Sequence, residues 1–357
     1  MAITDTELID LLARLSNAKA PSGFEDEVAD IARAFCADWA DVEVNSLLDI
    51  TITPRNCAPD KPTLMFDAHG DEVGGMVQSI LSGGTMNFVE LGHFAPGTLT
   101  GQDVWVRTKR GSWVRGVIGV KPPHFWSAAE QAAGKAPLTL DVGAVSKQDA
   151  VERFGIGIGE PLVPATAFSY DEQTGIAIGK AFDCRAGVCA LLLALRELAQ
   201  RDDLPVNVVG CISSQEEMGE RGAAAAARSI APAAAFLFEG CPADDTFTPK
   251  DEVQTALRQG PMFRYFDRCM ITNPRYQRFV LNVADQCGLP VQTAVRTGGG
   301  TNAGVIHQLD IPCVVAGIPC RYIHAGTAIC AVEDVRAAAE MGIAVAERLT
   351  PDALASF

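Results

Sequence analysis

Histidine and acidic residues follow apolar stretches of this 357-residue chain in a pattern that suits a metal site. His69 and Asp71 come directly after the apolar run 63–66, which predicts a buried strand. Side chains on an extended strand alternate between its two faces, so His69 and Asp71 point the same way. A histidine with a nearby carboxylate to hold its ring is a ready metal ligand. A strand end followed by an acidic surface turn would contain the same residues, so this motif alone leaves both interpretations open.

Further polar residues stand where other predicted strands stop or a helix starts. In parallel sheets, sites form beyond the carboxyl ends of the strands, so such residues can converge. The pattern therefore predicts one shared site rather than separate solvated turns. Its members are Glu216 and Glu217 after 208–212, Glu239 after 235–238, His324 after 314–318, and Asp183 at the start of the helix 185–200.

Each of these residues also has a structural explanation when taken singly. Asp183 would serve as a helix N-cap, and His324 as a buried histidine satisfied by hydrogen bonds. The Glu216–Glu217 pair would be a solvated helix entry, and Glu239 part of a turn. The other histidines lack a converging set of acids, so we interpret them as structural; they are His93, His124 and His307.

The combined residue types favour a pair of divalent ions. Histidine and carboxylate ligands without thiolate suit zinc, cobalt or manganese. Two ions need a carboxylate that bridges them, separate ligands for each, and a water whose pKa they lower. Adjacent side chains diverge, so one residue of the pair Glu216–Glu217 can bind metal while the other takes a proton from that water and passes it to a leaving amine.

Composition limits the classes of protein and of partner. Hydrophobic residues make up 48% of the chain, which is enough for a large core, and its length suits two domains. The net charge of −15 argues against nucleic acid and anionic membranes as partners. Eleven cysteines without a CxxC pair, an acidic amphipathic first helix over 4–17, and no apolar run of membrane-spanning length predict a cytoplasmic protein with reduced thiols.

The order of predicted elements indicates an α/β fold. Strands and helices alternate on both sides of a β-rich segment, which predicts a mostly parallel central sheet covered by helices on both faces. The β-rich segment reads as short strands between glycine and proline turns, including a hairpin around residues 109–111. We therefore expect catalytic-domain segments at 1–75 and 168–357, with a small inserted domain at 76–167. Ser22 followed by Glu25 predicts a capping box for a helix over 25–37.

Five motifs in order resemble the M42 family of metallo-aminopeptidases, the glutamyl and deblocking aminopeptidases of prokaryotes. The motifs are AHGDEVGGMV, AFDCRAG, SSQEEMGERGA, FEGCPADDT and IPCRYIHAG, and the resemblance covers nearly the whole chain. It implies an exopeptidase that removes N-terminal residues from peptides. It further implies that the inserted domain is an oligomerisation domain, which builds dimers and, in several members, a hollow dodecamer.

The resemblance also implies a role for each site residue. Asp183 would bridge the two ions. His69 and Glu239 would complete one ion, and Glu217 and His324 the other. Glu216 would be the general base, and Asp71 would orient His69.

Three residues depart from the pattern of the family. Glu239 stands where many members carry aspartate, and it reaches one methylene further. Asn302, in TGGGTNAG, stands where an aspartate is more usual, which removes a negative charge near the site. Cys184 stands where a polar residue is frequent.

Two other activities remain open from the residues. A metal-dependent amidohydrolase of acylated amino acids or other amides would need the same ligand set. A glycosidase would use two carboxylates without metal and would survive a chelator. The preferred N-terminal residue and the native metal are not determined by the sequence.

Overall fold

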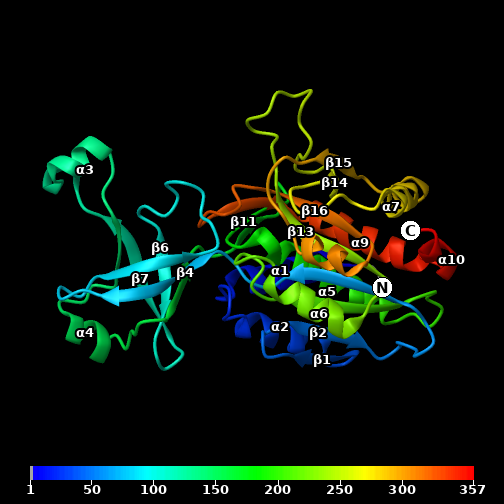
Figure 1. Ribbon diagram of the computed structural model, residues 1–357, viewed down its shortest axis with the longest axis horizontal. Helices are drawn as coiled ribbons and strands as arrows, with labels where there is room; N and C mark the ends of the chain where they lie inside the picture. Colours follow the sequence, from blue (N-terminus) through cyan, green and yellow to red (C-terminus); the bar gives the residue numbers. More distant parts are fainter. Residues whose placement is uncertain (1–2) are drawn as a thin grey trace.

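The computed structural model describes residues 3–357 and divides into a large α/β part and a small barrel, which lie side by side in Figure 1. The α/β part has an 11-stranded sheet, in which nine strands follow the order β1-β2-β12-β3-β13-β16-β17-β11-β10 and β14 and β15 attach beside β16. These strands are β1 Ala40–Val44, β2 Ile50–Pro54, β3 Thr63–His69, β10 Ser169–Asp171, β11 Ile176–Gly179, β12 Asn207–Ser213, β13 Ala234–Pro242, β14 Met262–Phe266, β15 Gln292–Val295, β16 Cys313–Arg321 and β17 Ala328–Ala331.

The sheet is mixed, and the prediction of a mostly parallel sheet was wrong in that respect. Its four central strands, β12, β3, β13 and β16, are parallel to one another. The flanking strands β1, β2, β17, β11 and β10 pair antiparallel. Short connections such as the β1–β2 turn can only join antiparallel strands, whereas the central strands are joined through helices.

Helices cover the sheet, and the strand residues alternate between two apolar layers. Leu64 and Phe66 of β3 pack in the larger cluster with α5, while Met65 packs on the other side with Ala223 of α6 and Ala303 of α8. The helices are α1 Asp5–Asn17, α2 Asp26–Cys36, α3 Ala128–Ala133, α4 Lys147–Glu152, α5 Phe182–Leu198, α6 Arg221–Ile230, α7 Pro274–Cys287, α8 Ala303–Ile306, α9 Val332–Arg348 and α10 Pro351–Ala355, with 3₁₀ turns η1 Pro123–Phe125 and η2 His307–Leu309.

Six strands form a closed barrel in the order β4-β5-β8-β7-β6-β9. The predicted hairpin around residues 109–111 is formed by β6 and β7, which pair antiparallel. Apolar side chains, including Val104, Ile118 and Leu140, fill the interior as a separate small core. The strands are β4 Gly74–Ile80, β5 Met86–Leu91, β6 Asp103–Arg107, β7 Trp113–Val120, β8 Leu138–Asp141 and β9 Pro161–Pro164.

The predicted capping box at Ser22 and Glu25 is not formed. Helix α2 begins at Asp26, and its N-cap Glu25 makes no side-chain capping hydrogen bond. Instead, Ser22 Oγ donates to Asp71 at 2.5 Å, and Glu25 Oε1 accepts the N–H of Gln215 at 3.1 Å. Both side chains are buried, so their partners come from the neighbouring strand ends rather than from the helix.

The described thiols and helices agree with two further expectations. All eleven cysteines are free. Among residues 3–357, no helix has the length and apolar character needed to cross a bilayer.

Candidate active site

The candidate residues meet at one edge of the sheet because the strands that carry them are parallel neighbours. His69 ends β3, Glu239 lies near the end of β13, and the turn with Glu216 and Glu217 follows β12. Ser213, the last residue of β12, stands opposite His69 in the register. His324 follows β16, with its backbone in the left-handed region at φ 57°. Carboxyl ends of parallel strands share an edge, which places these side chains together.

Asp183 lies between the two histidines. Its Oδ1 is 3.0 Å from His69 Nε2, and its Oδ2 is 3.2 Å from His324 Nε2. The residue lies in the first turn of α5 with a non-helical ψ of 105°, and no N-cap hydrogen bond from its side chain is present there. The N-cap interpretation is therefore replaced by one in which each carboxylate oxygen faces a different imidazole.

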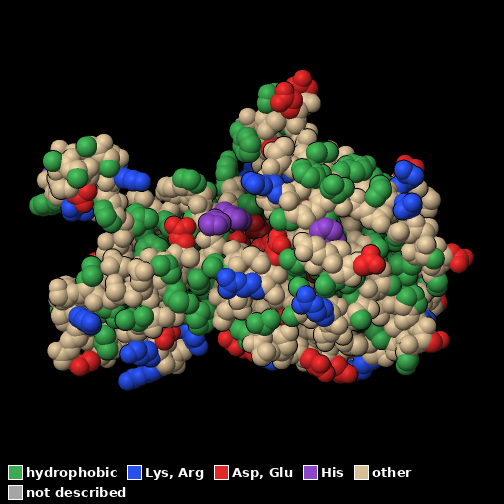
Figure 2. All heavy atoms as spheres, viewed as in Figure 1, with side chains coloured by type: hydrophobic (Ala, Val, Ile, Leu, Met, Phe, Trp, Pro, Cys, Tyr) green, Lys and Arg blue, Asp and Glu red, His purple; other side chains and the backbone are tan. Residues whose placement is uncertain are grey.

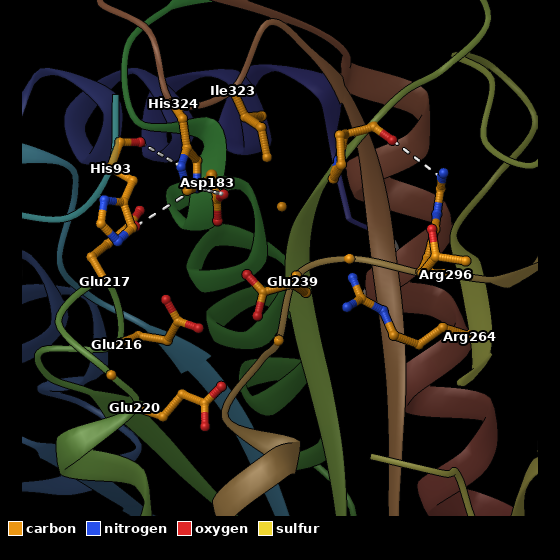
Figure 3. A pocket seen from close by; sticks show the side chains of 17 residues that line it. His93, Asp183, Glu216, Glu217, Glu220, Glu239, Arg264, Arg296, Ile323 and His324 are labelled. Carbon is orange, nitrogen blue, oxygen red and sulfur yellow. Dashed lines mark hydrogen bonds and ion pairs between the residues drawn. The ribbon is translucent and has the colours of Figure 1, made fainter. Parts of the chain in front are cut away.

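The remaining carboxylates divide between the two histidines. Glu239 Oε1 is 3.2 Å from His69 Nε2, and Glu217 Oε2 is 3.7 Å from His324 Nε2. Glu216 Oε2 stands 3.8 Å from His69 Nε2. Three overlapping groups of potential ligand atoms lie within 4.8 Å of one another: His69, Asp183, Cys184 and Glu239; His69, Glu216 and Glu217; and Asp183, Glu217 and His324. In Figure 3 the acidic side chains converge on the cavity from three different segments.

Asp71 holds His69 and the turn with Glu216 and Glu217 in place. One of its oxygens accepts the N–H of Glu216 at 3.0 Å and stands 3.4 Å from His69 Nδ1, and the other accepts the N–H of Glu217 at 3.2 Å. Burial acts to raise the pKa of Asp71, but the His69 ring and the hydrogen bond from Ser22 outweigh burial and lower that pKa. The carboxylate therefore stays ionised and holds both the histidine and the glutamate turn.

Burial and mutual repulsion shape the charges of the cluster. Burial raises the pKa of Glu217 to about 8, with the Asp183 carboxylate adding to the effect. Burial and the neighbouring acids also raise the pKa of Glu216 well above its usual value. For His324, burial lowers the pKa, but the Asp183 and Glu217 carboxylates outweigh it and raise the pKa to about 9. So many buried acids are stable together only with positive charge among them, which protons or divalent cations can supply.

A cavity of about 700 Å³ opens over these residues. On the surface it coincides with the place where histidine and acidic side chains gather beside the barrel (Figure 2). It is lined by Asp183, Glu216, Glu217, Glu239 and His324, by Arg264, and also by residues that the sequence did not indicate, namely His93, Glu220, Arg296 and the glycine run 298–300.

The cavity residues that were not predicted differ in how clearly the sequence indicates them. His93, interpreted as structural, lines the cavity, and its carbonyl faces His324 Nδ1 at 2.8 Å. Arg296 is a single cation with no motif around it, so nothing in the sequence marked it. The glycine run stands beside Asn302 in a segment that resembles the family, which was the available signal.

Cys184, which departs from the family pattern, has defined contacts in the structure. Its thiol is buried and lies 3.2 Å from the carbonyl of Phe238, to which it donates, and it accepts the N–H of Gly240 at 3.3 Å. These two residues flank Glu239. Cys184 therefore packs directly beneath this carboxylate.

A family model described as M42 glutamyl aminopeptidase matches residues 50–341. The chain belongs to this family. The aminopeptidase is 31% identical over 334 residues to the glutamyl aminopeptidase of Lactococcus lactis subsp. cremoris, covering 92% of both chains. It is a hydrolase that cleaves the N-terminal peptide bond of peptides and belongs to a metal-dependent family. The membership favours the aminopeptidase prediction over the amidohydrolase and glycosidase alternatives.

Solved structures agree with the fold of the aminopeptidase. A TET aminopeptidase from the marine sediment archaeon Thaumarchaeota archaeon SCGC AB-539-E09 matches with a TM-score of 0.92 and 35% identity, covering 98% of this chain and 99% of that one. The TET1 peptidase of Pyrococcus horikoshii, which can assemble into a tetrahedron or a large octahedral shell, matches with a TM-score of 0.85 and 26% identity, covering 96% and 100%.

Proposed function

We propose that the aminopeptidase works with two divalent ions, zinc, cobalt or manganese, held on either side of Asp183. The observation that carries this proposal is the placement of the Asp183 oxygens, one 3.0 Å from His69 Nε2 and the other 3.2 Å from His324 Nε2. A carboxylate that faces two imidazoles through different oxygens has the donor arrangement of a bridging ligand.

The two ends of the cluster would then hold one ion each. His69 and Glu239, 3.2 Å apart, would complete the first site, and Glu217 and His324, 3.7 Å apart, the second. Oxygen and imidazole donors without a required thiolate suit the three metals named above. Asp71, which faces the far nitrogen of His69, would fix the tautomer that leaves Nε2 free to bind metal.

Glu216 is the best candidate for the general base. When bound, the ions would polarise the scissile carbonyl and make water acidic. Glu216 lines the cavity and belongs to one of the three ligand groups, and its backbone N–H donates to Asp71, which fixes the direction of the turn. Its raised pKa suits a group that accepts a proton from the attacking water and then delivers it to the amine that leaves.

The test is to remove and restore the ions in two variants. The wild-type apoprotein should regain two ions per chain, by elemental analysis, together with peptidase activity. Glu216→Gln should bind two ions and lose about 10²–10⁴-fold in kcat. Glu333→Gln serves as the control, because Glu333 is exposed and lies outside both the cavity lining and the three ligand groups. A Glu216→Gln enzyme with two ions and undiminished kcat would refute the base assignment, and activity that persists without ions would refute the metal proposal.

We further propose a cytoplasmic homo-oligomer, built from dimers and extending to a dodecamer, that acts on short peptides. The inserted domain at 76–167 would make the contacts between subunits. The support is its exposed apolar side chains, including Val145, Ile158 and Phe125, of which the first is 80% exposed. The TET1 relative, which assembles into closed shells, supports the same assignment. Light scattering that finds a monomer at micromolar concentration would contradict it.

A further inference from the structure

We propose that the buried Asp67–Asn302 pair positions the wall of the cavity that the glycine run 298–300 forms. The proposal deepens the proposed function, because the wall belongs to the cavity in which the substrate would lie.

The pair is buried and in direct contact. Asp67 has 0% and Asn302 1% of its surface exposed. Asn302 Nδ2 donates to Asp67 Oδ2 at 2.9 Å and to Ser213 Oγ at 2.6 Å. Asp67 points to the same face of β3 as His69, two residues further on. A fully buried carboxylate needs a donor, and the Asn302 amide provides it.

The contact joins three segments that shape the site. β3 ends at His69, β12 ends at Ser213 just before the glutamate turn, and Asn302 follows the glycine run 298–300 in the cavity wall. The hydrogen bonds of one amide therefore tie the wall to the two strands that carry ligand candidates. A shift of Asn302 would move the wall relative to both strands.

The wall has little freedom to move without disturbing the site. A side-chain carbon added to Gly300 would lie 2.7 Å from Glu220 Oε1 and 2.5 Å from Cys269 Sγ. Both distances are shorter than van der Waals contact, so the backbone of the wall already packs closely against these side chains. Displacement by less than 1 Å would change the shape of the cavity that the glycine run and Glu220 line.

The chemistry requires one carboxylate and one amide, in either order. A carboxylate accepts hydrogen bonds and the amide nitrogen donates them, so the two groups are complementary. Two carboxylates at this distance would repel each other in a buried place. Among the described residues, Asp67 Oδ1 and Asn302 Oδ1 have no hydrogen-bond partner, so neither side chain is fully satisfied by its present neighbours.

The experiment is a swap of the two side chains. Asn302→Asp places two acids together, Asp67→Asn places two amides together, and the double variant restores one of each in exchanged positions. We expect Asn302→Asp to lower kcat/KM by about 10–100-fold, mainly through a higher KM. Asp67→Asn should have a smaller effect, because an amide oxygen can still accept from Asn302. The double variant should recover most of the loss.

Ion content and the split between KM and kcat separate positioning from general stability. A purely structural role would lower the unfolding temperature and leave the KM of the folded enzyme unchanged. If Asn302→Asp does not fold, recovery of folded, active double variant is the rescue, and a double variant that also fails to fold overturns the proposal. Asn302→Asp with wild-type KM, or a double variant no better than Asn302→Asp, overturns it too.

The outcome is distinguishable from failure of the metal proposal. Ion stoichiometry is measured on the wild type and does not depend on the swap. A wild type without paired ions would refute the proposed function, while rescue could still be seen as recovered peptidase activity. Absence of rescue in variants that bind two ions would refute the Asp67–Asn302 proposal alone.

Discussion

Replacing Asp71 by asparagine tests whether a buried carboxylate outside the cavity controls the ligands inside it. Asp71 accepts hydrogen bonds from Ser22 Oγ at 2.5 Å and from the N–H groups of Glu216 at 3.0 Å and Glu217 at 3.2 Å. It also faces His69 Nδ1 at 3.4 Å. Asparagine has the same shape but only one acceptor oxygen, so one of these two sides must meet an NH₂ group instead.

The less costly orientation can be worked out from the partners. If NH₂ faced Glu216 and His69, it would oppose the backbone N–H of one residue and crowd the ring of the other. If it faced Ser22 and Glu217, the hydroxyl could rotate and accept, leaving only the Glu217 N–H without a partner. That lost hydrogen bond to a charged group is worth about 1.5–3 kcal/mol. Since about 1.4 kcal/mol is tenfold, the ion that Glu217 and His324 would hold should bind roughly 10–100-fold more weakly.

The assay is a competition titration of the apoprotein with a chelator, followed by kcat and KM at saturating metal. Asp71→Asn should weaken one ion more than the other and lower kcat. Ser22→Ala is the matched control, because it removes the hydroxyl donor and leaves both backbone hydrogen bonds in place. If Asp71→Asn binds both ions as the wild type does and keeps its kcat, this buried carboxylate does not position the ligands and the reasoning is wrong.

Three further changes test other parts of the site. His324→Ala should retain one ion of two, and elemental analysis that still finds two would remove His324 from the ligands. Because the pKa of His324 is raised to about 9, its ring is cationic at neutral pH before metal binds. Metal binding should therefore release a proton. The affinity of the site for metal should fall as the pH drops below 9, by up to tenfold per pH unit for one proton. Calorimetry in buffers of different ionisation enthalpy would measure that release, and identical heats would contradict it. Arg264→Met should lower kcat/KM for an N-terminal glutamate relative to leucine by about 10–100-fold, since Arg264 offers charged donors to the cavity beside Glu239; an unchanged ratio in a panel of aminoacyl amides would refute this role.

The convergence of the candidate ligands was predictable because it depends on strand direction. His69, Glu217, Glu239 and His324 each follow an apolar run, and the runs form the four parallel strands at the centre of the sheet. The antiparallel strands at the edges of the sheet were missed because no pattern in the sequence indicates their direction. Strands such as β10 and β17 have three or four residues, too few for a clear alternation, and pairing with neighbours determines them.

Predictions from local sequence patterns were wrong where a polar side chain contacts residues that are distant in the sequence. Ser22 and Glu25 have the spacing of a capping box, but one bonds to Asp71 and the other to the turn before Glu216. Asp183 has the position of an N-cap, yet its oxygens face two histidines. In each case a buried strand end competed with a helix terminus for the same side chain. The strand end prevailed because a buried donor left unpaired costs more than a solvated one.

Asn302 shows why a departure from a family pattern cannot be interpreted at one position. From the sequence it indicates a missing negative charge near the site. The structure places Asp67, 235 residues away in the chain, with its carboxylate 2.9 Å from the Asn302 amide. The sequence did hold a signal for this pairing, because an aspartate directly after the apolar run 63–66 of a central strand must be buried and must find a donor. A carboxylate inside a predicted core strand is therefore reason to look for its hydrogen-bond donor elsewhere in the chain before inferring that a function has changed.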